Sequence, residues 1–124
     1  MYARGMPDGN PPPLTPAGFQ VALALASGHA HGYGIMAFIA EVTDGAAQLG
    51  PGTLYRTLSR LAADGLVEET TDITDGAPHD ARRRNYRLTG LGRRAAEREA
   101  RQLSALLDAA SAAGLADTGR AESA

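Results

Sequence analysis

The stretch from Gly50 to Gly65 constrains the fold more than any other part of the chain. Proline suits the first turn of a helix and glycine suits the residue just after its end, so Gly50-Pro51 and Gly65 mark the two ends of a helix. Four apolar residues recur between them with helical spacing and predict a face packed on a core: Leu54, Leu58, Leu61 and Ala62. Another face is polar and has hydrogen-bonding reach: Tyr55, Arg56, Ser59 and Arg60.

Helical spacing predicts two shorter helices ahead of this one. The first covers residues 15–26 and opens on Thr15-Pro16, an N-cap followed by a proline in the first turn. The second begins at residue 31 or 32 and ends before Gly45. Its expected buried stripe consists of Ile35, Met36, Ile39, Ala40 and Val42. We expect a short extended piece at residues 47–49, before the third helix.

The chain beyond Gly65 predicts a hairpin and a long helix. Residues 66–70 and 85–88 suit two short strands, and polar turn formers separate them. Thr89 can cap a helix that runs to about residue 113 and is therefore roughly 35 Å long. An apolar stripe follows this helix: Ala96, Ala100, Leu103, Leu106, Leu107 and Ala110. So small a domain is too short to cover the whole stripe, which predicts a partner helix and hence a homodimer.

This order of elements is typical of a mainly α fold with a small β-hairpin, namely a winged helix-turn-helix with a long C-terminal dimerisation helix. A length of 124 residues suits one such domain. We expect a disordered, Gly- and Pro-rich arm at residues 1–13 and the DNA-binding domain at 14–88. The dimerisation helix is expected at residues 89–113 and a flexible tail at 114–124.

The charge of the chain gives two opposing indications about nucleic acid. A net charge of −2 and a pI near 5.9 argue mildly against binding it. The local distribution matters more, however, and all twelve basic residues are arginine, with four between positions 82 and 87. Arginine suits bidentate contacts with phosphate and guanine. A GC-rich genome also favours arginine, but it does not explain the clustering.

Several classes of function find no support in the residues. Without cysteine the chain has neither a disulfide nor a thiolate metal site. The spacing of His29, His31 and His79 does not suit a metal, so we expect no metal and no cofactor. No nucleophile–base–acid set or phosphate loop is visible, so we expect no enzyme. No apolar run approaches the length of a membrane span and no signal core is visible, so we expect a cytoplasmic protein without a membrane partner.

Three short blocks of sequence carry a family resemblance. They are HGYGI at 31–35, GTLYRTL at 52–58 followed by DGLV at 64–67, and RRNYRLT at 83–89. Together they resemble the PadR family of bacterial transcriptional regulators. In that family they correspond to the opening of the second helix, to the recognition helix with the first wing strand, and to the second wing strand with the start of the dimerisation helix. The single C-terminal helix is similar to the shorter PadR subgroup.

The resemblance implies a repressor that binds a pseudo-palindromic operator in double-stranded DNA as a homodimer. The expected DNA contacts are Tyr33, Thr53, Tyr55, Arg56, Ser59, Arg60, Arg82, Arg83, Arg84 and Arg87. For Tyr33 core packing stays an alternative, and Thr53 also suits hydrogen bonding at the start of the helix. A solvated surface stays the alternative for Tyr55, Arg56, Ser59 and Arg60 and for Arg82, Arg83 and Arg84. The other function left open is a winged-helix protein-interaction module that does not bind DNA, which the acidic pI favours.

The resemblance also implies a small-molecule effector that releases DNA by changing the geometry of the dimer. Four apolar side chains are candidates for the lining of its cavity: Phe19, Leu23, Leu103 and Leu107. The simpler interpretation is that all four belong to the core of the dimer. The chain has no tryptophan, a residue that some ligand-binding members of the family use in this cavity, so the resemblance fixes no ligand.

Overall fold

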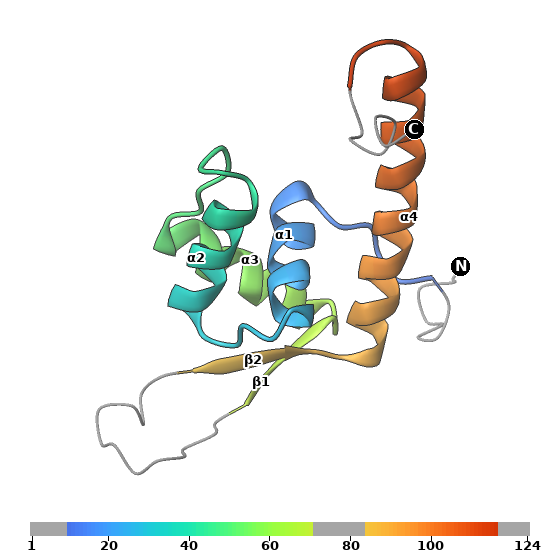
Figure 1. Ribbon diagram of the computed structural model, residues 1–124. Helices are drawn as coiled ribbons and strands as arrows, with labels where there is room; N and C mark the ends of the chain where they lie inside the picture. The colour runs from blue at the N-terminus through green and yellow to red at the C-terminus, as the bar shows by residue number, and fades with distance from the viewer. Residues whose placement is uncertain (1–9, 71–83, 117–124) are drawn as a thin grey trace.

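The computed structural model describes residues 10–70 and 84–116. Its elements, in chain order, are α1 (Pro16–Ala26), α2 (Gly32–Val42), α3 (Pro51–Ala63), β1 (Val67–Thr70), β2 (Asn85–Leu88) and α4 (Gly90–Ala112). The first three helices pack together, the antiparallel hairpin β1–β2 lies along one end of them, and α4 rises along one side and extends past them (Figure 1). The expected fold class, mainly helical with one hairpin and a long C-terminal helix, is confirmed.

Local capping explains where the helices begin. The Thr15 hydroxyl accepts a hydrogen bond from the Gly18 N–H at 2.9 Å, with Pro16 as the first residue of α1. The Thr89 hydroxyl accepts one from the Gly92 N–H at 3.0 Å and caps α4 in the same way. Each side chain satisfies one backbone donor that the first turn of a helix leaves without a partner. Both N-caps were predicted from the sequence.

The end of α3 is fixed by a Schellman motif. Gly65 has a φ of 78°, the left-handed conformation that glycine adopts without strain. Its N–H donates to the Ala62 carbonyl at 3.0 Å, and the Leu66 N–H donates to the Leu61 carbonyl at 2.9 Å. The chain therefore turns sharply from α3 into β1, as the sequence signal at Gly65 predicts.

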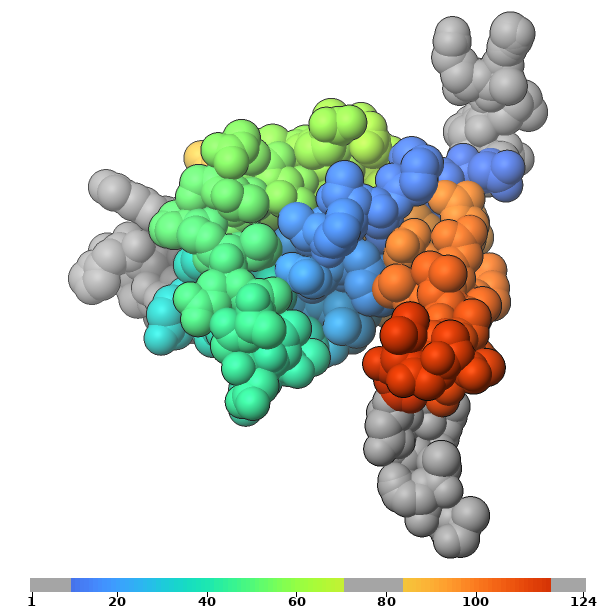
Figure 2. Space-filling view, turned by 90° about the horizontal axis from the view of Figure 1, so that it is seen from above, coloured from blue at the N-terminus to red at the C-terminus, as the bar shows by residue number. Residues whose placement is uncertain are grey.

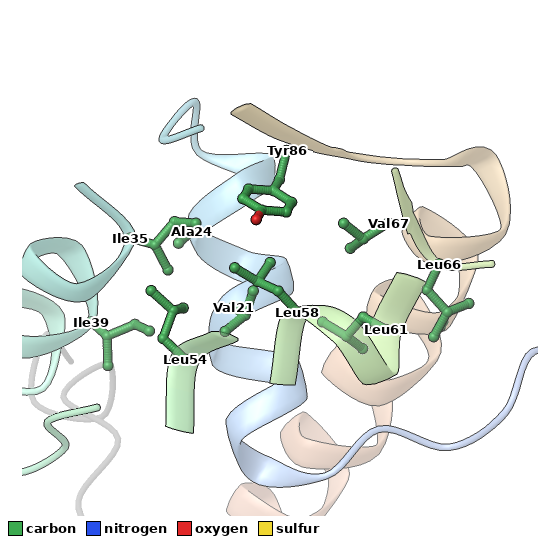
Figure 3. Packing of buried hydrophobic residues seen from close by; sticks show 11 residues of the cluster. Val21, Ala24, Ile35, Ile39, Leu54, Leu58, Leu61, Leu66, Val67 and Tyr86 are labelled. Carbon is green, nitrogen blue, oxygen red and sulfur yellow. The ribbon is translucent and has the colours of Figure 1, made fainter. Parts of the chain in front are cut away.

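The core lies where α1, α2 and α3 meet the hairpin (Figure 3). Its largest fully buried side chains are Val21, Ile35, Leu54, Leu58 and Leu66. Tyr86 of β2 closes the core from the hairpin side, and Ala95 is the buried residue that α4 adds to it. Because Leu54, Leu58 and Leu61 are all buried, the orientation of α3 about its own axis is fixed.

The buried faces of the helices are narrower than the apolar pattern predicts. Val42 was expected in the buried stripe of α2, but 56% of it is exposed, because it ends the helix one turn beyond the buried Ile39. Ala62 was expected on the core face of α3 and is exposed, because it lies about 100° around the helix from the buried Leu61. Periodicity gives the direction of a buried face, whereas the neighbouring elements decide its width.

The expected extended piece at residues 47–49 forms no strand. The Thr43 hydroxyl donates to the Ile39 carbonyl at 2.9 Å and accepts from the Ala47 N–H at 2.9 Å, so the chain curls back on the end of α2. The third strand-like position lies ahead of α2 instead, where His31 pairs with Asn85 in an isolated antiparallel bridge. The backbone before α2 thus extends the sheet beside β2.

Two further features concern the ends of the described chain. Arg98 of α4 donates a hydrogen bond to the Pro11 carbonyl, so the segment before α1 contacts α4. The Leu115 N–H donates to the Ala110 carbonyl at 2.8 Å and closes the end of α4, with Gly114 at a φ of 81°. Among the described helices, none combines the length and the apolarity that crossing a membrane requires.

Candidate nucleic-acid interface

The polar face of α3 points away from the core, as its sequence predicts. Tyr55, Arg56, Ser59 and Arg60 are all exposed. The Arg56 guanidinium donates to the Thr53 hydroxyl at 3.3 Å, and the Arg60 guanidinium lies 3.9 Å from the Asp64 carboxylate. Both contacts stay within α3 and its C-cap, so both guanidinium groups remain open to a ligand from solvent.

A close contact joins α2 and α3 at the edge of this face. A Cβ atom added to Gly32, the first residue of α2, would overlap the Tyr55 hydroxyl oxygen. A larger residue at this position would therefore require the exposed Tyr55 side chain to move, so Gly32 lets the Tyr55 hydroxyl lie against the start of α2. No role was predicted for Gly32, because only the packing of α2 on α3 brings it beside Tyr55.

Tyr33 follows directly and projects into solvent, with 81% of its surface exposed. The alternative that Tyr33 packs in the core is therefore wrong. Thr53, in the first turn of α3, is half-buried and keeps its hydroxyl beside Arg56. Tyr33 and Tyr55 lie in the N-terminal parts of α2 and α3 respectively, and both are exposed.

A groove of about 770 Å³ runs between α3 and the segment before α1. Figure 2 shows this segment, in blue, beside α3, in green, on one face of the protein. The α3 wall includes Tyr55, Arg56, Ser59 and Arg60, and the opposite wall includes Pro13, Leu14 and Thr15. The groove includes none of the four side chains proposed for an effector cavity, which stays a prediction.

The described arginines of the hairpin each contact a glutamate. The Arg87 Nε lies 2.7 Å from a Glu68 carboxylate oxygen, directly across the antiparallel pair. The Arg84 Nε lies 3.2 Å from a Glu69 carboxylate oxygen. Arg82 and Arg83 lie outside the described residues. Acidic residues of the wing were expected to weaken its positive field, but only the register of the hairpin shows which glutamate each arginine faces.

Tyr86 lies between these two pairs along β2 but points into the core. Burial raises the pKa of its hydroxyl above the ordinary value of 10.0, while a hydrogen bond with Arg84 acts in the opposite direction. Tyr86 therefore stays neutral and serves packing. Leu88, on the same face of β2 as Tyr86, is half-buried, and Arg87 is exposed on the other face.

The C-terminal half of α4 leaves its leucines uncovered. The exposed fractions of Leu103, Leu106 and Leu107 are 41%, 65% and 44%. Ala100 is exposed, and Ala96 and Ala110 are half-buried. On α1, Leu23 is exposed to 37% and Phe19 is half-buried. Within the described part of the chain, no three His, Cys, Asp or Glu side chains gather as metal ligands would.

Two solved structures share this fold. A PadR-like transcription factor from Bacteroides fragilis has a TM-score of 0.59 and 25% identity, over 76% of this chain and 85% of that one. A transcriptional regulator from Clostridium thermocellum has a TM-score of 0.60 over 76% of this chain and 87% of that one. The latter is 22% identical and supports the fold alone.

Two curated proteins are similar in sequence. An uncharacterised 37.1 kDa protein in transposon TN4556 of Streptomyces fradiae is 41% identical over 86 residues, which are 69% of this chain and 22% of that protein. Transcriptional regulator Rv3488 of Mycobacterium tuberculosis is 44% identical over 59 residues, 48% of this chain and 51% of that protein. The chain thus spans about a fifth and about half of the lengths of these relatives.

The family match covers the elements that build the candidate interface. Residues 22–98 match the transcriptional regulator PadR-like family. That range includes α2, α3, the hairpin and the first turns of α4. Because the match extends over more than half of the chain, this chain belongs to the PadR-like family of transcriptional regulators.

Proposed function

We propose that this protein is a repressor that binds duplex DNA as a homodimer. One observation carries the proposal: the polar face of α3 is exposed while its apolar face is anchored in the core. The major groove of DNA admits an α-helix, and an arginine there reads guanine through two hydrogen bonds. Arg56 and Ser59 would meet base edges, while Tyr33 and Thr53 would meet the phosphate backbone.

The exposed leucine stripe of α4 supports the homodimer. Leu103, Leu106 and Leu107 are exposed in the C-terminal half of α4, the helix that extends past the others (Figure 1). A second copy of α4 would cover the stripe and place the two α3 helices on the same face of the dimer, related by a two-fold axis. The operator would then be pseudo-palindromic, with half-sites about one turn of DNA apart.

A protein-interaction module that does not bind DNA is the second candidate function. Two observations favour it: the net charge of −2 and the pairing of the described wing arginines with glutamates. Both weaken the positive potential that attracts a polyanion. The polar face of α3 favours DNA nevertheless, because within residues 10–70 and 84–116 Arg56 and Arg60 contact Thr53 and Asp64, which belong to the same helix and its cap.

A gel-shift titration separates the two functions. The probe is a duplex that contains the region upstream of this protein's own gene, and a shuffled duplex of equal composition is the control. We expect the upstream duplex to shift at a lower protein concentration than the shuffled one. When the same region is placed before a reporter gene, the protein should lower the expression of that gene. Failure to shift either duplex at low salt would favour the interaction module.

A further inference from the structure

The two ion pairs of the hairpin put negative charge where a DNA-binding wing needs positive charge. Arg87 contacts Glu68 at 2.7 Å and Arg84 contacts Glu69 at 3.2 Å. About two thirds of each arginine side chain is exposed, at 67% and 65% respectively. The arginines thus face solvent, but each already has a carboxylate partner.

Stability is a poor explanation for these pairs. An exposed ion pair contributes only a fraction of a kcal/mol because water and salt screen it. The hairpin is held in place by other contacts: Tyr86 and Val67 are buried in the core, and the Tyr86 N–H donates to the Ala30 carbonyl at 3.0 Å. The glutamates therefore have a larger effect on the charge of the wing than on the fold.

A carboxylate and a DNA phosphate offer the same chemistry to a guanidinium group. Both are anions that present two acceptor oxygens, and both bind arginine through charge-assisted hydrogen bonds. A phosphate that binds Arg84 or Arg87 must therefore displace the glutamate or share the guanidinium group with it. The free energy gained from each such contact is reduced by the ion pair that is lost.

We propose that Glu68 and Glu69 act as intramolecular competitors of DNA phosphate and so set the sequence-independent part of this protein's DNA affinity. The inference rests on the proposed DNA-binding function. The glutamates compete for arginines that would bind phosphate, which every duplex carries, so their effect should be equal on cognate and random duplexes. The affinity that remains then depends more strongly on the base contacts of α3, and the complex dissociates more readily than one with free wing arginines.

Glu68→Gln and Glu69→Gln test the proposal, because each keeps the size of the side chain and removes its charge. We expect each variant to bind both duplexes on the order of 3- to 10-fold more tightly, since a dimer loses the competitor twice. The slope of log K against log salt should steepen by up to about 2, at about 0.9 per new phosphate contact. A gain in affinity cannot result from a damaged fold, which distinguishes this effect from a structural one.

Two controls separate competition from a general change of charge. Glu97→Gln removes the same charge from an exposed position on α4 and should leave the affinity within about 2-fold of the parent value. In the Arg87→Ala background, Glu68→Gln should lose at least half of its gain in log K, because the competitor then has no arginine to occupy. A gain that persists in full without Arg87 would overturn the proposal.

The outcomes also separate this inference from the proposed function. Unchanged affinity in Glu68→Gln and Glu69→Gln, with the parent protein binding DNA normally, would overturn the competition and leave the DNA-binding function intact. A gain on the cognate duplex alone would also overturn it, since competition with phosphate is blind to sequence. If neither the parent nor any variant binds a duplex at low salt, the DNA-binding function fails and the inference fails with it.

Discussion

The hydroxyl of Thr89 donates a hydrogen bond to the carbonyl of Gly65 at 2.7 Å and so ties the start of α4 to the end of α3. The Thr89 N–H also donates to the Leu66 carbonyl, at 3.0 Å. Gly92 packs directly against this corner, where an added Cβ would overlap the Leu66 carbonyl oxygen. The helix proposed to read DNA and the helix proposed to dimerise are therefore held together at a closely packed corner.

Replacing Gly92 should open that corner. We expect Gly92→Ala to lower the free energy of unfolding by about 3 kcal/mol, because the methyl group must push the backbone of Leu66 aside. Gly90→Ala is the matched control: it lies in the same turn with nothing within 4 Å of an added Cβ. It should be neutral or stabilising by about 0.5 kcal/mol. Urea unfolding followed by circular dichroism measures both, and equal midpoints would contradict the close approach.

The leucine stripe of α4 predicts the assembly state. Replacing Leu103 and Leu107 with glutamate should give monomers at micromolar concentration, because the charges cannot be buried without partners. Ala105→Glu adds a charge to a different face of the same helix and should leave the dimer intact. Sedimentation velocity distinguishes the two species. If the unmodified protein sediments as a monomer, the dimer proposal fails.

Arg56 should contribute to the protein's preference for its operator over random DNA. We expect Arg56→Ala to weaken binding to the cognate operator by about 1–3 kcal/mol and binding to random DNA by less, because base edges are read only at the correct site. Arg101→Ala, an exposed arginine of α4, controls for the loss of one positive charge. Isotherms on both duplexes give the two losses. Equal losses would instead place Arg56 on the phosphate backbone.

Tyr86 predicts how stability depends on alkaline pH. Its pKa is raised by burial in the folded protein, so the folded state favours the neutral hydroxyl relative to the unfolded chain. This contribution is fully present below the ordinary value of 10.0 and is lost as the pH rises through the folded value. The unfolding free energy of the parent should therefore fall more steeply above pH 10 than that of Tyr86→Phe. Parallel curves from pH 8 to 11 would exclude this coupling.

Elements with local signals could be predicted from the sequence. Each of these signals joins residues within a few positions of each other, so it can be recognised in the sequence. They are the caps at Thr15 and Thr89 and the end of α3 at Gly65. The two faces of α3 follow from one helical period for the same reason. Tyr55, Arg56, Ser59 and Arg60 were accordingly placed on the correct, exposed face.

Features that depend on distant pairing could not be predicted. The partner of Arg87 is Glu68, nineteen positions away, and only the register of the hairpin brings them together. The bridge of His31 to Asn85 was missed for the same reason. The extended piece expected at residues 47–49 has no such partner strand and forms none. The exposure of Val42 depends on how far the neighbouring helices extend, and this cannot be predicted from the sequence alone.

The central position of α1 has a consequence for how this chain is made. α1 contacts α2, α3, β2 and α4, so of the described elements the one made first packs against the two made last. Neither Tyr86 nor Ala95 is available to the core until the hairpin and the first turns of α4 have emerged from the ribosome. We therefore expect the elements from α1 to β2 to stay open until α4 begins to emerge, and then to fold with it as one unit.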